Sequence, residues 1–428
     1  MKKKYLQLPQ TSIVLAALIF IIVLFFWGCN QVDNVSPLYS QTFSNTADPQ
    51  IVSISPADSA FAGIDELTIT GHNFPTDSKQ LLVYFNTTVA TILSVDSNKI
   101  VVKAPNIVKD SISIKIDKLV NALKISNVLS YKLISATQTI KEFSTGNRPY
   151  MITLDNSANL YYSSTLNSVS EGVIKITPDG VASEYAKKGG ETFYSALKFA
   201  KTDGLLGSRK VTAIFKVAQG AVPVVYLSGF SSAIVDFDYD ANGSIWAVSS
   251  QDQIYRINPA TKDKKTFSRV GLFRVCRVYN GFLYAAGQKS SSDKSEIVWR
   301  FPIVNADSIG VAEVYFDFSA AGYSSVVTPV TIQGITFSQD GFLYIGNDGA
   351  EPIIIVNPTD KSSAPLFPGV LNPTKKNKLI ALFWGEGYYL YYVRQIINTD
   401  DKTVPLPLSD AIIKVNTRKF GAPYFGNN

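Results

Sequence analysis

The sequence predicts an all-β protein in which a small antiparallel sandwich is followed by a ring of repeated sheets. Three observations support this fold class. The chain contains 22 Tyr and 25 Phe residues and many β-branched residues, and such side chains fit the pleated, half-buried surface of a sheet. Turn residues separate short alternating segments near the N-terminus. One strand pattern recurs through the last two thirds of the chain, as expected of a repeat architecture.

The composition is that of a globular protein and gives no sign of a nucleic-acid partner. The 428 residues are 46% hydrophobic and 17% charged, which suits two or three domains with cores of their own. The formal net charge of +6 falls to +3 without residues 1–28, which hold three Lys and no acidic residue. Lys375, Lys376 and Lys378 form a tight basic cluster late in the chain, and we expect it in a solvated loop. We therefore expect no nucleic acid as a partner.

The counts of histidine and cysteine exclude several kinds of site. His72 is the single histidine, so a multi-His zinc site is impossible and any Ser-His-Asp or Cys-His mechanism would have to use it. The two cysteines are Cys29 and Cys276. Cys276 lies in an apolar run, so we expect a buried, inert thiol there.

The amino terminus has the features of an export signal over residues 1–28. Lys2–Lys4 form a positive segment, and Ile13–Trp27 is a run of 15 residues without a charged or strongly polar side chain. This run is short for a membrane-spanning helix, which needs about 20 residues. The segment Leu24–Cys29 resembles the lipobox of bacterial lipoproteins, in the relaxed form that is familiar in Bacteroidetes. The resemblance implies cleavage before Cys29 and a lipid anchor on its side chain.

We therefore expect a lipid-anchored protein of the bacterial cell envelope, in the outer membrane and facing either the periplasm or the cell surface. The alternative is an uncleaved signal anchor, which would export the rest of the chain equally well. Residues 29–47 are rich in Ser, Asn, Gln and Thr and lack periodicity, which indicates a flexible tether.

Residues 48–133 predict the sandwich. Turn residues separate its strand-like segments at spacings near ten, and the size of about 85 residues suits one immunoglobulin-like module. The segment also resembles the IPT/TIG family. Leu67–Phe74 matches the most specific motif of that family, a strand ending in Gly-x-Asn-Phe, and Pro49–Pro56 matches its opening strand and proline turn. The resemblance implies a spacer or binding module. The residues themselves predict Gly71 at a backbone turn that other residues could not adopt and Phe74 at one end of the core. We expect His72 in an exposed loop, because no second His or Cys lies near it.

Residues 137–428 contain the repeated unit. Each copy has an apolar strand, a turn rich in Asp, Asn and Gly, an aromatic strand, a third strand and a short fourth strand. The clearest copies lie at 150–180, 234–259 and 333–358, with weaker copies between and after them. A four-stranded unit of this length is typical of a propeller blade, and six units of about 48 residues fit the segment.

The repeat pattern resembles NHL-like and TolB-like six-bladed β-propellers, a resemblance that implies the fold and says little about function. We expect residues 422–425 to close the ring by pairing with a strand near 139–143, because that edge would otherwise be exposed.

One segment of the propeller resembles the first half of a calcium loop. Asp238, Asp240 and Asn242 offer oxygens at alternate positions before Gly243. The twelfth position is Ser249 rather than a bidentate Glu, and the segment lies between two strands. A hairpin turn explains the same residues. We therefore expect no bound metal or cofactor, and this loop is the one weak calcium candidate.

A catalytic propeller is the alternative to a binding one. Propellers of the gluconolactonase type hold a metal in the central channel with Glu, Asn and Asp side chains. The candidates here for a channel mouth are Asp155, Asp236, Asp348 and Glu386. No motif places them together, so we predict no catalytic residues and keep a metal-dependent lactonase or lyase as the minority interpretation.

The strongest ligand-binding candidates are aromatic. Tyr388, Tyr389, Tyr391 and Tyr392 occupy four of five consecutive positions, so at least one must point to each side of a strand. Exposed aromatic faces stack on sugar rings, although most aromatics in such strands pack between blades. We therefore predict a non-enzymatic envelope lipoprotein whose propeller binds a surface glycan. The other alternative is a scaffold for an envelope protein, which would need an exposed apolar patch.

Overall fold

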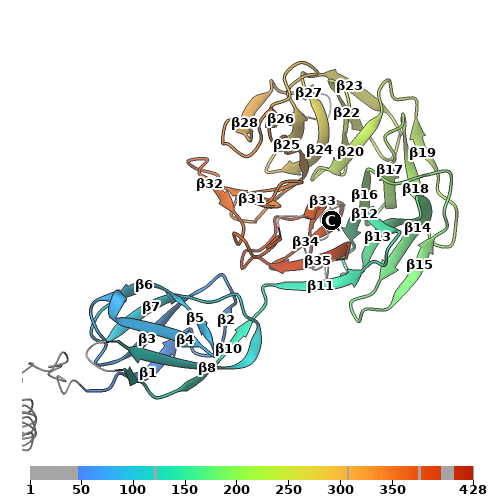
Figure 1. Cartoon of the computed structure of the whole chain (residues 1–428). Helices are drawn as coiled ribbons and strands as arrows, with labels where there is room; N and C mark the ends of the chain where they lie inside the picture. The colour runs from blue at the N-terminus through green and yellow to red at the C-terminus, as the bar shows by residue number, and fades with distance from the viewer. Residues whose placement is uncertain (1–46, 120–122, 306–307, 375–376, 397–408, 428) are drawn as a thin grey trace, which may run out of the picture.

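The computed structural model describes residues 47–119, 123–305, 308–374, 377–396 and 409–427, which form two all-β domains (Figure 1). The predicted fold class is confirmed, because a two-sheet sandwich precedes a six-bladed propeller. The expected signal segment and nearly all of the tether, Cys29 included, lie outside the described residues. No helix in the described part of the chain is long and apolar enough to cross a membrane.

The sandwich consists of two sheets. The first sheet contains, in spatial order, β1 (Gln50–Ser55), β3 (Glu66–His72), β7 (Lys99–Lys103) and β6 (Thr91–Val95). The second sheet contains β2 (Ala60–Phe61), β10 (Leu129–Ile134), β8 (Lys109–Lys118), β4 (Leu81–Phe85) and β5 (Thr88–Val89), with β9 (Lys124–Ile125) paired to β8. A short 3-10 helix, η1 (Ser78–Gln80), precedes β4. Alternate residues of β3 and β8 are fully buried in one shared core, as a sandwich requires.

Gly71 is required by a close approach of two strands rather than by an unusual backbone turn. A Cβ atom at this position would lie 1.9 Å from the carbonyl oxygen of Gln50 on β1 and 2.4 Å from the ring of Phe74. Phe74 is 4% exposed and belongs to the sandwich core. The left-handed backbone falls instead on Asn73, whose φ is 62°, a conformation that Asn tolerates. His72 is exposed, as the sequence predicts.

The propeller has six blades of antiparallel strands arranged in a ring around a central axis (Figure 1). Five of them follow one another in the chain and run from the channel outward. They are β12 (Asn147–Leu154), β13 (Leu160–Leu166), β14 (Val169–Ile176) and β15 (Ala182–Ala186); β16 (Ala196–Ala200), β17 (Gly204–Ser208), β18 (Ala213–Val217) and β19 (Val224–Ser228); β20 (Ile234–Tyr239), β21 (Ile245–Ser249), β22 (Gln253–Ile257) and β23 (Lys264–Ser268); β24 (Leu272–Tyr279), β25 (Phe282–Gln288), β26 (Glu296–Asn305) and β28 (Glu313–Asp317), with β27 (Ser308–Ile309) paired to β26; and β29 (Ile332–Phe337), β30 (Leu343–Asn347), β31 (Ile353–Val356) and β32 (Ser363–Pro365).

The blade β20–β23 shows why the repeated pattern folds in this way. Gly243 turns the chain with a φ of 80°, and its N–H donates to the carbonyl oxygen of Asp240 at 3.0 Å. The next strand then places Ile245 and Trp246 on opposite faces, and both are fully buried in different clusters. A blade therefore needs a neighbour on each side to cover its two apolar faces.

The sixth blade closes the ring with strands from both ends of the propeller. It contains β33 (Asn377–Trp384), β34 (Tyr389–Ile396), β35 (Ala411–Asn416) and, outermost, β11 (Thr137–Glu142). The expected closure is right in its N-terminal strand and wrong in its partner, because β11 pairs with β35 and not with residues 422–425. The end of the chain instead turns inward through η2 (Phe425–Asn427), and Figure 1 shows the C-terminus at the centre of the ring.

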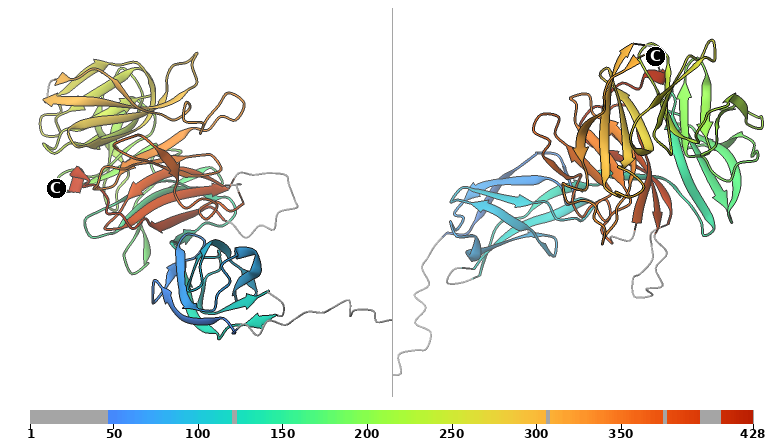
Figure 2. Two further views of the ribbon diagram at one scale, coloured as in Figure 1. Left: turned by 90° about the vertical axis from the view of Figure 1, so that its left-hand side faces the viewer. Right: turned by 90° about the horizontal axis from the view of Figure 1, so that it is seen from above.

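The sandwich lies at the rim of the propeller, beside the closing blade (Figures 1 and 2). Arg418, which follows β35, donates a hydrogen bond of 2.6 Å to the Asp65 carboxylate of the sandwich. Its guanidinium also lies 4.3 Å from the ring centroid of Phe61. Asp65 is buried, and its ion pair with Arg418 joins the sandwich to the closing blade.

Candidate functional site

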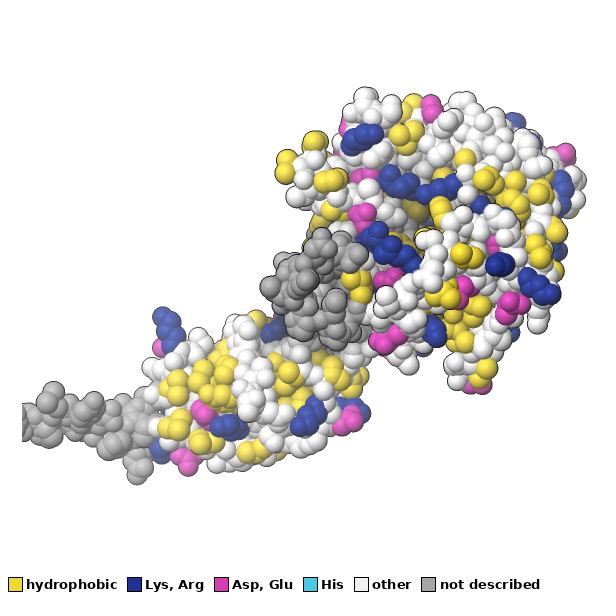
Figure 3. Space-filling view, turned by 45° about the vertical axis from the view of Figure 1, so that its right-hand side comes forward, with side chains coloured by type: hydrophobic (Ala, Val, Ile, Leu, Met, Phe, Trp, Pro, Cys, Tyr) yellow, Lys and Arg dark blue, Asp and Glu magenta, His cyan; other side chains and the backbone are white. Residues whose placement is uncertain are grey.

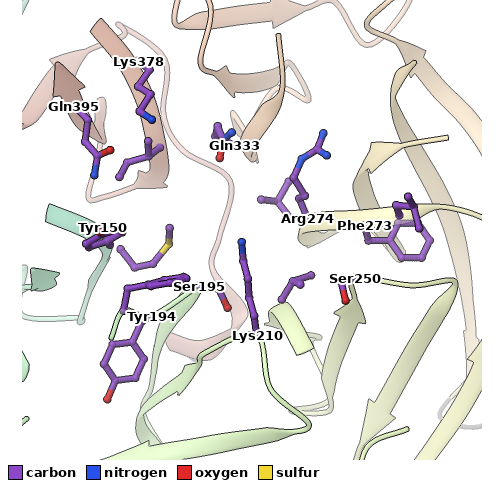
Figure 4. A pocket seen from close by; sticks show the side chains of 16 residues that line it. Tyr150, Tyr194, Ser195, Lys210, Ser250, Phe273, Arg274, Gln333, Lys378 and Gln395 are labelled. Carbon is purple, nitrogen blue, oxygen red and sulfur yellow. The ribbon is translucent and has the colours of Figure 1, made fainter. Parts of the chain in front are cut away.

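The channel opens into a cavity of about 460 Å³ at the face where the innermost strands begin, a volume in the range of small-molecule sites. All six blades contribute to its lining, and Figure 4 shows the side chains arriving from different sides. One lining residue from each blade, in chain order, is Tyr150, Ser195, Ser250, Arg274, Gln333 and Lys378. Because these residues begin or end strands of a closed ring, the cavity is formed before any ligand arrives.

Two aromatic side chains form part of the cavity wall. Tyr150 on β12 and Phe193, which precedes β16, stack with ring centroids 5.4 Å apart and planes inclined by 20°. Both side chains are only partly buried, so they present apolar surface to the cavity. The ammonium nitrogen of Lys210 lies 5.8 Å from the Phe193 ring centroid. Such a wall suits the apolar face of a sugar ring.

The same cavity is basic. Lys210, Arg274 and Lys378 are among its lining residues, and no lining residue is acidic. Figure 3 shows Lys and Arg side chains gathered around a hollow in the propeller. Arg274 is held by the buried carboxylate of Glu296 and donates from Nε to the carbonyl oxygen of Ile332 at 3.2 Å. Burial raises the pKa of Glu296, against the opposing effect of Arg274.

Two amide side chains at the mouth are held by hydrogen bonds. Gln395, at the end of β34, is 3% exposed and donates to the carbonyl oxygen of Pro149 at 2.7 Å. Gln333, at the start of β29, donates to the Thr331 hydroxyl at 2.6 Å. Asp348 accepts from the Thr331 backbone N–H at 2.6 Å. These bonds orient the polar groups in advance, which lowers the entropy lost when a ligand binds.

Below the cavity, a layer of ion pairs crosses the channel. Lys198 on β16 lies 3.6 Å from the Asp236 carboxylate on β20, and Arg277 on β24 lies 2.7 Å from the Asp238 carboxylate. Burial opposes the charge on Lys198, but Asp236 and Asp238 outweigh it and raise the pKa of its ammonium group. Asp236 also accepts from the N–H of Cys276 at 2.8 Å. Each ion pair joins neighbouring blades, so the layer fastens the ring from inside.

Cys276 itself is a buried thiol, as expected. Burial raises the pKa of this thiol well above its ordinary value, which keeps it protonated and unreactive.

The opposite end of the channel is closed by the C-terminal segment. Tyr424 is 9% exposed and packs edge-on against Phe383 with ring centroids 5.5 Å apart. Arg277 donates to the carbonyl oxygen of Pro423 at 2.8 Å. The backbone N–H of Lys201 donates to the carbonyl oxygen of Gly426, also at 2.8 Å. Figure 2 shows the C-terminus at one face of the propeller. A second cavity of about 300 Å³ remains beside this segment.

The half calcium motif does not assemble a calcium loop. Asp238 points into the channel and pairs with Arg277. Asp240 accepts from the N–H groups of Asn242 and Ser244 at 2.9 Å and from the Trp246 indole at 2.8 Å. These bonds are those of a hairpin turn, and Asn242 is exposed on it. Within the described ranges, no group of three or more His, Cys, Asp or Glu side chains could hold a metal ion.

The four carboxylates proposed for a channel mouth do not converge. Asp155 and Glu386 line the smaller cavity beside the C-terminal segment. Asp236 lies in the ion-pair layer in the middle of the channel. Asp348 lies near the open end, where Thr331 holds it. The structure thus divides these residues among three levels of the channel.

The tyrosine cluster is also divided. Tyr391 and Tyr392 are buried, 9% and 2% exposed, while Tyr388 and Tyr389 are 40% and 37% exposed. Tyr388 contacts Phe420 with ring centroids 4.2 Å apart. The exposed pair lies at the turn between β33 and β34, and the other ends of these strands reach the basic cavity through Lys378 and Gln395. The exposed tyrosines therefore lie on the face opposite that cavity.

Sequence reasoning missed the residues that line the basic cavity. They are scattered one or a few to a blade, so no short motif contains them. Lys378 was expected in a solvated loop, but it lies at the start of β33 and lines the cavity. Their position in the repeat could have predicted them, because the residues that begin the innermost strands of a propeller meet at one mouth.

Comparison with known proteins supports the architecture. Residues 49–131 match the family model of the IPT/TIG domain, and the search of curated proteins found no match. The chain is similar to an auxiliary nutrient binding protein from Bacteroides thetaiotaomicron VPI-5482, with 10% identity, a TM-score of 0.50, and coverage of 88% of this chain and 99% of that one.

It is also similar to a putative phosphatase from Bacteroides thetaiotaomicron VPI-5482, with 11% identity, a TM-score of 0.54, and coverage of 87% of this chain and 98% of that one. At these identities the likeness concerns the fold, and it extends over both domains. The chain is thus an IPT/TIG domain followed by a six-bladed β-propeller.

Proposed function

We propose that this protein is a non-enzymatic lipoprotein of the cell envelope, and that its propeller binds a saccharide in the basic cavity. The observation that carries the proposal is the combination, in one pre-formed mouth, of a stacked aromatic pair with oriented polar side chains. The similarity to an auxiliary nutrient binding protein supports a binding role. The blade pattern supports placement among the NHL/TolB-like propellers.

The expected mode of binding follows from the wall of the cavity. A sugar ring packs its apolar face against the surface that Tyr150 and Phe193 leave open to the cavity, and their mutual stacking keeps that surface rigid. Its hydroxyl groups meet Gln333, Gln395 and Ser195, all of which line the same space. Binding sites for small polar ligands commonly combine a mainly apolar wall with a few such polar groups.

A non-enzymatic role fits the state of the acidic groups. Asp236 and Asp238 in the channel are paired with Lys198 and Arg277. Glu296 beside the cavity is paired with Arg274. A general acid or base must reach a proton of the substrate, and these carboxylates are already occupied by protein cations.

A glycan array probed with the full-length protein in detergent tests the binding proposal. We expect defined saccharide hits that are lost, by at least about tenfold in affinity, in the variant Tyr150→Ala/Phe193→Ala. The matched control is Tyr388→Ala/Tyr389→Ala, on the opposite face, which should keep the hits. Loss of binding in the control variant alone would show that the saccharide binds at Tyr388 and Tyr389 and not in the basic cavity. An array without hits would overturn the saccharide proposal.

The anchor is a separate part of the proposal. Cys29 carries the lipid, the membrane is the first partner, and an envelope protein is the alternative partner of the propeller. Metabolic labelling with a lipid precursor should mark the wild-type protein and not the Cys29→Ala variant. Labelled Cys29→Ala protein would exclude lipidation at this position.

A further inference from the structure

We infer that the saccharide bound in the basic cavity is anionic, carrying a carboxylate or sulfate group that lies between Lys210 and Lys378. This inference rests on the proposed saccharide site and specifies its ligand. Both lysines line the cavity, one after β17 in the second blade and one on β33 in the sixth. Figure 4 shows the two side chains extending into the cavity from different blades.

The two lysines differ from three other basic side chains of the propeller in having no carboxylate partner within the described part of the chain. Arg274 is paired with Glu296, Lys198 with Asp236, and Arg209 with Glu191. Among the described residues, no carboxylate forms a salt bridge with Lys210 or Lys378. Lys378 is partly buried in spite of its charge, whereas Lys210 is exposed at the mouth. Cationic side chains without a carboxylate partner at one cavity are favourable for binding an anion.

Two acidic groups beside this mouth, Glu296 and Asp348, have other partners than the two lysines. Glu296 is 1% exposed and already holds Arg274 while accepting from the Ile332 N–H at 3.1 Å. Asp348 accepts from both the N–H and the hydroxyl of Thr331 at 2.6 Å. Asp348 keeps its negative charge because its donors are neutral, but the lining carries three basic residues and no acidic one, which favours an anionic ligand.

The aromatic wall specifies a sugar rather than a free small anion. Lys210 lies beside the Phe193 ring, which stacks on Tyr150. A sugar ring placed on that wall therefore carries its substituents toward the ammonium group. A carboxylate on a uronic acid and a sulfate ester present the same charged oxygens, and Lys binds both as a point charge.

The test compares matched glycans that differ only in charge, using the full-length protein in detergent and isothermal titration. The probes are an oligogalacturonide and its methyl ester, and a sulfated galactan oligosaccharide and its desulfated form. We expect at least one charged probe to bind about tenfold or more tightly than its neutral form, with an affinity that falls as salt is added. The pair that responds identifies carboxylate or sulfate as the source of charge.

The double variant Lys210→Gln/Lys378→Gln should lose about tenfold in affinity for the charged probe and lose the salt dependence. Lys414→Gln is the matched control, because Lys414 lies over the Tyr389 ring at 3.9 Å on the opposite face.

Equal binding of charged and neutral forms, abolished by Tyr150→Ala/Phe193→Ala, would overturn the anionic ligand and leave saccharide binding intact. Absence of binding to every saccharide would overturn both proposals. The salt dependence of the affinity is measured on the wild-type protein, so a variant that fails to fold does not affect this part of the test.

Discussion

The two ends of the propeller channel are built from the same six blades and differ in charge and access. One end is an open cavity with three basic lining residues and a stacked aromatic pair. The other end is filled by the C-terminal segment, with Asp155 and Glu386 in the smaller cavity beside it. The shared fold therefore does not decide which end binds a ligand. That choice depends on which end residues 422–427 fill and on which residues begin the innermost strands.

The ion-pair layer between the two ends should give the largest effect on stability. Arg277→Ala removes the salt-bridge partner of the fully buried Asp238 and the hydrogen bond to Pro423. Breaking such a buried pair costs about 3–5 kcal/mol of unfolding free energy. Denaturant unfolding of the propeller measures the loss. Arg300→Ala, which breaks the exposed pair with Glu313, should cost about 1 kcal/mol or less. Equal losses of unfolding free energy in the two variants would show that the buried ion pair contributes no more to stability than the exposed one.

The closed end can be opened by one substitution. Tyr424→Ala removes a buried ring between Phe383 and Tyr239 and should lower the unfolding free energy by about 3 kcal/mol. The Tyr424 hydroxyl has no hydrogen-bond partner among the described residues, so Tyr424→Phe should be close to neutral. Thermal unfolding distinguishes the two variants. Saccharide affinity at the other end should stay within about twofold in both, and a larger change would mean that the ends are coupled.

The contribution of Glu296 to the charge of the open end can be tested with the variant Glu296→Gln. Burial raises the pKa of this carboxyl above 4.5, with Arg274 opposing the rise. Protonated Glu296 favours the folded state, because its pKa is higher there than in the unfolded chain. This part of the unfolding free energy is fully present below the pKa of Glu296 in the unfolded chain. It is lost as the pH rises through the higher pKa in the folded protein. Glu296→Gln avoids that loss, so the variant should gain stability relative to the wild type as the pH rises above 4.5.

The same substitution frees Arg274, so an acidic saccharide should bind about threefold more tightly to Glu296→Gln. Unfolding curves at several pH values and titration with the charged probe measure the two effects. Glu313→Gln, on the outer strand β28, is the matched substitution and should leave the affinity unchanged. Weaker binding of the acidic probe to Glu296→Gln would contradict the assigned charge of the cavity.

Local patterns were sufficient to predict the fold because each blade is specified by adjacent residues. The turn at Asp240–Gly243 and the buried pair Ile245 and Trp246 lie within seven consecutive residues. Ring closure was predicted only in part, since it depends on pairing between strands more than 260 residues apart, β11 and β35. No local pattern distinguishes β35 from the C-terminal segment that enters the channel.

The candidate site was harder to predict because burial in a blade does not follow the alternation of a half-exposed strand. Tyr391 and Tyr392 point to opposite faces of β34, yet both are buried because another blade covers each face. On the inner strands exposure occurs at the strand ends, as Tyr388 and Tyr389 show at the other face. The cavity residues Tyr150 and Lys378 lie far apart in the sequence and meet only when the ring closes.

The closing strand also has a mechanical consequence. β11 follows β10 of the sandwich after two residues, and it is the outermost strand of the last blade. A pull on the sandwich therefore loads the hydrogen bonds between β11 and β35 before any other part of the propeller. The contact of Arg418 with Asp65 and Phe61 ties the sandwich to the same blade, so it shares that load. Tension applied from the N-terminal side would then separate β11 from β35 and open the ring, and the Arg418 contact would carry part of that force.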